Sequence, residues 1–249
     1  MERFRTDLVV VGLLLAAGLV VTGEIVSQMV YAVKTMDVTQ ISVTGSAEQA
    51  ITSNRVKWRS SFQLPAGRSP AELARGVAEI HRQLALVESF FAAHGVSADQ
   101  LTVHPLQILP QYSQCPQNAP CTPSVSGYSL TQNLRVDSSQ VSAVTKLANS
   151  SSGLVSQGVV FQAQPPTYYY QGLSQIRTAL LVKAIADARD QAEQIAGSSG
   201  VALGPLRSVG VGVFQLTAPN STQISGYGAY STATIPKVLH AVLRATFSL

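Results

Sequence analysis

The chain has few charged residues and few aromatic residues, and each scarcity excludes a class of protein. Charged side chains make up 12% of its 249 residues and aromatic side chains 6%, whereas 46% of the sequence is hydrophobic. Intrinsic disorder requires low hydrophobicity and high charge, so this chain folds. The 17 lysines and arginines exceed the 13 acidic residues but never form a run. This diffuse excess argues against a nucleic-acid partner.

The motifs of common catalytic and cofactor sites are also missing from the sequence. It contains neither a G-x-S-x-G nucleophile turn nor a phosphate-binding G-x-x-x-x-G-K-[ST] loop. The four histidines stand singly, without an H-x-x-x-H pair and without a neighbouring cysteine. We therefore expect no catalytic residue, no cofactor and no metal site, which predicts a protein that is not an enzyme.

The N-terminal region contains the longest apolar run. Residues 8–21 are uninterruptedly apolar and follow Arg3 and Arg5. This length lies between that of a signal-peptide core and that of a membrane span. No clear small-residue cleavage site follows, so we favour a retained signal anchor within residues 1–37 that contacts the membrane through residues 8–33. A cleaved signal peptide is the alternative. The preceding arginines predict a cytoplasmic N-terminus and an exported body.

The two cysteines are consistent with export. Cys115 and Cys121 lie in a short polar stretch that is rich in proline. Two thiols this close in an oxidising compartment are expected to form a disulfide, with two unpaired thiols as the alternative. The C-x5-C spacing differs from the C-x-x-C of redox motifs, so we interpret the bridge as structural.

Hydrophobic periodicity predicts an α+β body over residues 38–249. Alternation with a period of two indicates strands, and apolar residues three and four apart indicate helices. The expected strands are 38–45, 54–64, 101–112, 125–136, 155–164, 204–215 and 237–248. The expected helices are 70–94, a shorter one that is capped by 137–139 and ends at 147, and 173–196. Residues 46–53 are either a connection or a bulged continuation of the first strand, and residues 150–153 are expected to form a turn.

The order of these elements repeats. Residues 54–136 and 155–248 each read as a β-α-β-β unit, and each unit has its longest loop at the tip of its hairpin, at 113–124 and 216–236. Two such pseudo-repeats predict helices packed on one side of a mixed or antiparallel sheet. The predicted organisation is an N-terminal transmembrane helix followed by one body at 38–249.

Tyrosines near loops and an alanine-rich helix are candidate contact surfaces. The candidate tyrosines are Tyr168, Tyr169, Tyr170, Tyr227 and Tyr230. Tyrosine adds contact area at a low cost in conformational entropy. Subunit or partner contact, binding of a glycan or other polymer, and simple loop packing all stay open for them. Ala188 and Ala192 belong to a row of small residues that permits close approach of either a sheet or a second helix. An alanine-rich helix that only reflects high helix propensity is the alternative to an assembly face.

Four segments give the sequence a resemblance to the SIMPL-domain family of bacterial envelope proteins. They are ISVTGSAEQAITSNRVKW, GYSLTQNLRV, KAIADARDQAEQIAGSSGVALG and VLRATFSL. The resemblance covers about residues 38–249. It implies a periplasmic or membrane-anchored protein that is linked to stress defence, and it brings no catalytic residues with it. Members of the family that assemble do so as rings.

These observations predict a single-pass inner-membrane protein with its body in the periplasm. We expect it to self-associate into a homo-oligomer and to contact an envelope protein partner. The alternative is a ligand-binding or hydrolytic envelope enzyme with a site between the two pseudo-repeats.

Overall fold

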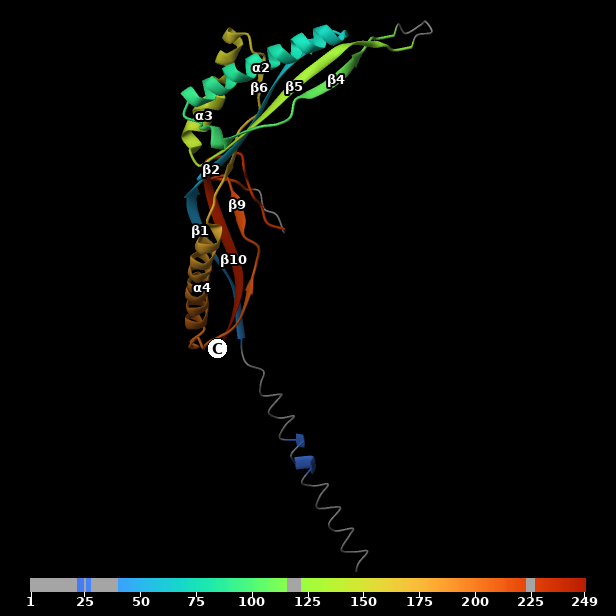
Figure 1. Ribbon diagram of the computed structural model, residues 1–249. Helices are drawn as coiled ribbons and strands as arrows, with labels where there is room; N and C mark the ends of the chain where they lie inside the picture. Colours follow the sequence, from blue (N-terminus) through green and yellow to red (C-terminus); the bar gives the residue numbers. More distant parts are fainter. Residues whose placement is uncertain (1–21, 25, 28–39, 116–121, 223–226) are drawn as a thin grey trace, which may run out of the picture. The chain divides into compact units, whose positions relative to one another are not determined.

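The computed structural model describes residues 22–24, 26–27, 40–115, 122–222 and 227–249 (Figure 1). The expected membrane segment at 8–33 lies almost entirely outside these residues, and so does Cys121. In the part of the chain that is described, no helix is both long enough and apolar enough to cross a membrane.

The chain divides into two compact units, whereas the sequence pattern predicts one body over residues 38–249. Unit 1 consists of Met1–Ser46, Lys183–Gly212 and Val242–Leu249. Unit 2 consists of Ala47–Val182 and Val213–Ala241. The boundary falls inside three elements: β1 (Gln40–Thr52), α4 (Leu173–Ser198) and β10 (Pro236–Ser248).

An antiparallel six-stranded sheet forms the body of unit 2. Its order is β3-β5-β2-β6, while β4 also pairs with β5 and β7 also pairs with β2. The strands are β2 (Arg55–Ala66), β3 (Leu101–Val103), β4 (Gln107–Tyr112), β5 (Val125–Ser138), β6 (Phe161–Ala163) and β7 (Thr167–Tyr169). The two long central strands, β2 and β5, confirm the expected strands at 54–64 and 125–136.

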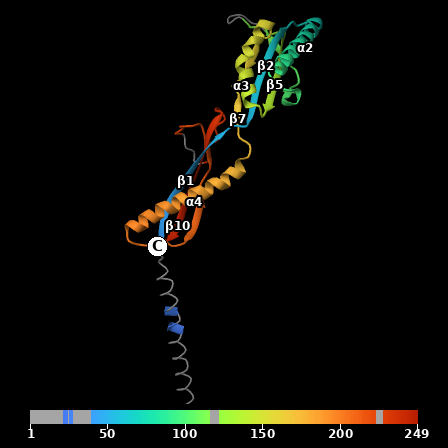
Figure 2. The ribbon, with the colours of Figure 1, turned by 90° about the vertical axis from the view of Figure 1, so that its left-hand side faces the viewer.

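Helices α2 (Pro70–Ala93) and α3 (Val141–Ser150) pack on one face of this sheet (Figures 1 and 2). The Ser69 side chain accepts a hydrogen bond from the Glu72 N–H at the start of α2, and the Glu72 carboxylate accepts one from the Ser69 N–H. This capping box satisfies donors that an α-helix leaves unpaired at its first turn. Between helices and sheet lies an apolar core in which the rings of Trp58 and Phe91 lie 5.3 Å apart.

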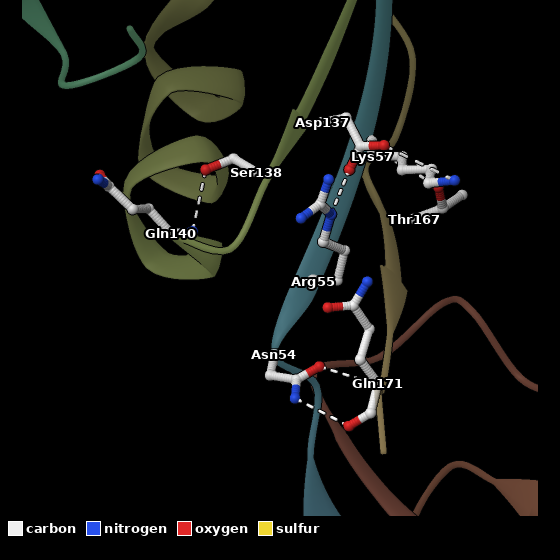
Figure 3. Close-up of polar contacts among 8 residues, drawn as sticks. All are labelled: Asn54, Arg55, Lys57, Asp137, Ser138, Gln140, Thr167 and Gln171. Carbon is white, nitrogen blue, oxygen red and sulfur yellow. Dashed lines mark hydrogen bonds and ion pairs between the residues drawn. The ribbon is translucent and has the colours of Figure 1, made fainter. Parts of the chain in front are cut away.

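Two expected boundaries in this region are wrong. The expected strand 101–112 is interrupted between β3 and β4, where Pro105 has no N–H to donate to a neighbouring strand. Residues 137–139 do not cap α3, because β5 extends to Ser138 and the N-cap is Gln140. The Ser138 hydroxyl instead accepts a hydrogen bond from the Gln140 N–H at 3.0 Å (Figure 3).

The segment after α3 also differs from expectation. The expected turn at 150–153 and the start of the expected strand 155–164 form a 3₁₀ helix, η2 (Ser151–Gln157), whose Leu154 is buried in the core. Only β6 remains of that strand, and β7 follows in a region that was expected to be a loop. The alternation of apolar and polar residues predicts a strand here, but packing of Leu154 into the core favours a short helix.

The other sheet has the order β1-β10-β8, with β9 (Gln215–Thr217) also paired to β10. The first strand continues to Thr52, so the bulged or continued alternative for 46–53 is the correct one. The expected strand 204–215 divides into β8 (Leu206–Val211) and β9. The strand beside β10 is β1, whereas β6 belongs to the six-stranded sheet. The second pseudo-repeat is therefore wrong in its first strand.

Candidate functional site

The small residues of α4 form a packing surface inside unit 1. Ala188 and Ala192 have no exposed surface, and α4 runs beside β1 and β10 (Figures 1 and 2). Gly45 of β1 lies so close that an added Cβ would sit 2.6 Å from the Ala188 Cβ. Of the two interpretations of this row, packing against a sheet is the correct one. Both alanines are therefore unsuited to contact another subunit.

The three consecutive tyrosines in and just after β7, which precede α4, have different surroundings. Tyr168 is 7% exposed, belongs to the apolar core of unit 2 and lies with its hydroxyl 3.1 Å from the Thr145 hydroxyl. Tyr170 packs on a second apolar cluster around Leu180. Tyr169 is partly exposed, and its ring lies 5.3 Å from the Lys57 ammonium. Of the three, only Tyr169 lines one of the surface hollows described below.

Tyr227 and Tyr230 belong to a segment that hydrogen bonds join to β9 and to Tyr170. The Tyr230 hydroxyl accepts a hydrogen bond from the Tyr170 N–H, and its ring lies 6.2 Å from that of Tyr169. Backbone hydrogen bonds on both sides of Tyr230 join this segment to Leu216. Tyr227 is fully exposed. Tyr230 is 45% exposed and packs against its own chain at the same time. Contact with a subunit or partner stays a prediction for Tyr227 and Tyr230.

The face of the six-stranded sheet that is turned away from α2 and α3 carries several charged side chains. Val56, Trp58 and Phe62 of β2 are buried beneath the helices. Successive side chains on a strand point to opposite faces, so the intervening cations point away from the core. We call Arg55, Lys57 and Arg59 of β2 together with Arg135 of β5 the basic face.

One carboxylate on this face is already paired with two cations. Asp137 of β5 lies opposite Lys57 in the strand register. Its carboxylate accepts a hydrogen bond from the Arg55 Nε at 2.5 Å and lies 3.8 Å from the Lys57 Nζ (Figure 3). Asp137 is therefore surrounded by positive charge, and the basic face keeps a formal charge of about +3 because four cations share this one anion.

The other two cations of the basic face are opposed to each other. Arg59 and Arg135 are direct partners in the antiparallel register of β2 and β5. Within the described chain, neither guanidinium has an ion pair or a side-chain hydrogen bond. Like charges directly opposite each other destabilise an antiparallel pair, so this arrangement costs stability in the absence of an anion.

The opposed arginines lie where two surface hollows meet. A hollow of about 510 Å³ contains Arg59, Arg135, Asn133, His104 and Leu106 in its wall. A second hollow of about 290 Å³ is lined by the same two arginines together with Lys57, Thr167 and Tyr169. Gln164 borders both. We call the two hollows together the groove. Their volumes are of the order of those of small-molecule sites, about 300–1,000 Å³.

The walls of the groove are held by hydrogen bonds from the core side of the sheet. The indole Nε1 of Trp58 donates to the Gln164 carbonyl at 2.8 Å, and the Gln164 N–H donates to the Arg59 carbonyl at 3.1 Å. On the opposite wall, the buried amide of Gln132 donates to the His104 carbonyl at 2.5 Å. The residues between β3 and β4, which include Pro105, form this wall. The site is thus ordered before any ligand arrives.

Titratable groups elsewhere in the described residues do not gather into a metal site. Groups of three or more histidine, cysteine, aspartate or glutamate side chains able to hold an ion are not found there. Among the described residues of unit 2, Lys237 is the only buried cation, and its Nζ donates to the Ser231 carbonyl at 2.6 Å. Burial lowers the pKa of this lysine. The predicted Cys115–Cys121 bridge includes a residue outside the described ranges and stays a prediction.

The strand at one edge of the four-stranded sheet is exposed along its whole length. All six residues of β8 are exposed, and they include Leu206, Val209 and Val211. Among the described strands, only β10 pairs with β8. The exposed β4 of the other sheet contains Pro110, which lacks a donor and makes that edge less suited to pairing. An apolar edge without proline can pair with another strand.

The basic face is the feature that sequence reasoning missed. The signal lies in the alternation of Arg55, Lys57 and Arg59, since a period of two places all three on one face of a strand. Counting runs of basic residues overlooks this pattern. The contribution of Arg135 depends on the register between distant strands, and the sequence does not display that register.

Comparison with known proteins agrees with the resemblance noted from sequence segments. A family model described as SIMPL, protein of unknown function (DUF541), matches residues 41–242. A search of curated proteins returned no match. The matched region includes residues of both compact units and all of the basic face.

Proposed function

Since the chain belongs to the SIMPL family, we propose that it is a non-enzymatic protein of the bacterial envelope that self-associates into a homo-oligomer. Residues 8–33 anchor it in the inner membrane with the N-terminus in the cytoplasm and the body in the periplasm. The apolar run after Arg3 and Arg5 supports the anchor and its orientation. Envelope stress defence, which the sequence resemblance implies, is the process in which we place it.

The observation that carries the proposal of self-association is the exposed edge strand β8. Its unpaired side offers backbone donors and acceptors, while Leu206, Val209 and Val211 offer apolar side chains. Pairing of this edge with a second copy buries both sets of groups. Anchoring confines the copies to one plane and raises their effective concentration, so a short strand contact suffices.

A charge on the edge strand tests this proposal. Val211→Lys places a cation on β8 at a side chain that is 53% exposed, so the fold accommodates it. The control is Val155→Lys, which makes the same change in η2 at a side chain that is 59% exposed. We expect the detergent-extracted full chain to be heavier than a monomer by native mass spectrometry. Val211→Lys should lower that mass, whereas Val155→Lys should not.

Two outcomes contradict the proposal. One is a monomeric wild-type particle, and the other is a Val211→Lys particle with the mass of the wild type. Far-UV circular dichroism of each variant confirms that a lower mass does not come from unfolding.

The proposed topology has a separate test. A membrane-impermeant thiol reagent should label a cysteine introduced at Ser221 in intact spheroplasts but not one introduced at Thr6. The test uses a background in which Cys115 and Cys121 are replaced by serine. Labelling of both positions only after lysis contradicts the exported body.

A further inference from the structure

We propose that the groove on the basic face binds a phosphorylated small molecule, with its terminal phosphoryl group held between Arg59 and Arg135. The inference concerns unit 2 and does not depend on the proposed self-association. It rests on the register of two strands, on the absence of a partner for either arginine in the described chain, and on the shape of the surface around them.

The first step of the argument is the uncompensated charge. Arg59 and Arg135 lie opposite each other on neighbouring strands, whereas the carboxylate of Asp137 is paired with Arg55 and Lys57. Opposed like charges destabilise the pair of strands unless an anion lies between them. A bound anion converts this repulsion into two attractive contacts.

The second step is the choice of anion. A phosphomonoester carries about −1.5 to −2 charges near neutral pH and three terminal oxygens. Two arginine forks offer two positive charges and donors for several of these oxygens at once. A carboxylate has one charge and two oxygens, which a single fork already satisfies. The pair of Arg59 and Arg135 therefore suits a phosphoryl group better than a carboxylate.

The third step is the space beside the arginines. On one side lies the hollow of about 510 Å³ with Asn133 and Ser61 in its wall, and on the other lies the hollow with Thr167 and Tyr169. Amide and hydroxyl groups with one aromatic ring are suited to a polar organic body such as a sugar. The wall is ordered by the hydrogen bond from Trp58 to Gln164, so little ordering is required on binding.

The test is isothermal titration calorimetry of the full chain in detergent, with glucose 6-phosphate as the probe. Unphosphorylated glucose and glucuronate, which carries a carboxylate on the same sugar, are the comparison ligands. We expect glucose 6-phosphate to bind with a Kd below about 1 mM, glucuronate to bind more weakly and glucose to give no heat. Added salt should weaken the binding of glucose 6-phosphate.

Three substitutions locate the site. Arg59→Gln and Arg135→Gln should each weaken binding of glucose 6-phosphate about tenfold or more, because each removes charged hydrogen bonds. Arg135→Lys should restore part of the affinity, since it restores the charge but not the fork. The control is Arg82→Gln, which removes the same charge from α2, where Arg82 pairs with Glu79 on the helical side of the sheet.

Thermal unfolding without ligand gives a second, independent measurement. Arg59→Gln should raise the melting temperature of the ligand-free chain because it removes the opposed charge. Glucose 6-phosphate should raise the melting temperature of the wild type more than that of the variant. An arginine with a purely structural role would instead lower the melting temperature when replaced.

Several results overturn the inference. They are no binding of glucose 6-phosphate by the wild type, equal binding of glucuronate, and equal weakening by Arg82→Gln. Vesicles that contain phosphatidic acid distinguish a membrane source of the phosphoryl group. Arginine-dependent binding to these vesicles without binding of glucose 6-phosphate overturns the small-molecule assignment. Particle masses measured on the same samples keep this result separate from that of self-association.

Discussion

Replacing Gly45 by alanine should loosen unit 1, because α4 lies against the glycine without room for a side chain. A Cβ at this position would lie 2.1 Å from the Ala184 carbonyl oxygen and 2.8 Å from the Ala188 backbone N. Contacts this short require something to move. The atoms that clash belong to the backbone of a helix and cannot rotate away as the end of a side chain does. We therefore expect β1 and α4 to be pushed apart.

The change in the free energy of unfolding on Gly45→Ala is the sum of two opposing contributions. Overpacking in a close-packed interior destabilises by about 1–3 kcal/mol, and a clash with backbone belongs at the upper end of that range. Replacing glycine also reduces the conformational entropy of the unfolded chain, which stabilises the folded chain by about 0.4–1 kcal/mol. The expected net loss is about 2 kcal/mol. The control is Gly197→Ala in the same helix, where nothing lies within 4 Å of the added Cβ. That change should stabilise the chain by up to about 1 kcal/mol.

Hydrogen exchange measured by mass spectrometry reports the change locally. A loss of about 2 kcal/mol corresponds to about thirtyfold faster exchange, since about 1.4 kcal/mol is a factor of ten. We expect this acceleration in peptides from β1 and from residues 184–192, with little change in peptides around the Trp58 core. Wild-type exchange rates in Gly45→Ala would refute the reasoning, and so would an equal acceleration in Gly197→Ala.

Three further predictions concern unit 2 and the hairpin tip. Burial lowers the pKa of Lys237 in the folded chain below its ordinary value of 10.5. Between the lowered pKa and 10.5, the unfolded chain binds a proton that the folded chain does not, so the free energy of unfolding rises with pH. Urea midpoints compared between about pH 7 and pH 10 should show this rise in the wild type and lose it in Lys237→Met. Tyr168→Phe should cost about 1 kcal/mol through loss of the Thr145 contact, and Tyr168→Ala about 3 kcal/mol or more, by thermal denaturation. Non-reducing peptide mapping should find Cys115 joined to Cys121, whereas two free thiols would show that the tip is held in another way.

The sequence predicts those helices and strands that depend on interactions between residues close together in the chain. The expected strand 54–64 and helix 70–94 are examples: Val56, Trp58 and Phe62 alternate along β2, and the capping box of Ser69 and Glu72 lies at the start of α2. These signals depend on neighbours in the sequence, so they can be recognised without the fold. The α+β class and the family follow from the same kind of signal.

Pairing between distant strands could not be predicted in this way. Whether a short strand such as β6 joins β2 or β10 depends on long-range contacts, which leave no trace in local periodicity. The candidate site has the same limitation. Arg59 and Arg135 are 76 positions apart in the sequence and become neighbours only through the register of β2 and β5. A search for chemistry along the sequence therefore finds isolated arginines.

The strand order of the two sheets has a consequence for biosynthesis. The six-stranded sheet uses only residues up to Tyr169, so all its strands exist once that part of the chain has been synthesised. In the other sheet, β10 is the central strand and also the last to be synthesised. Until it emerges, β1 and β8 lack the partner between them. A nascent chain that stalls before residue 236 would keep a complete six-stranded sheet and expose β1, β8 and β9 without their partner strand, which is the form that chaperones and proteases would encounter.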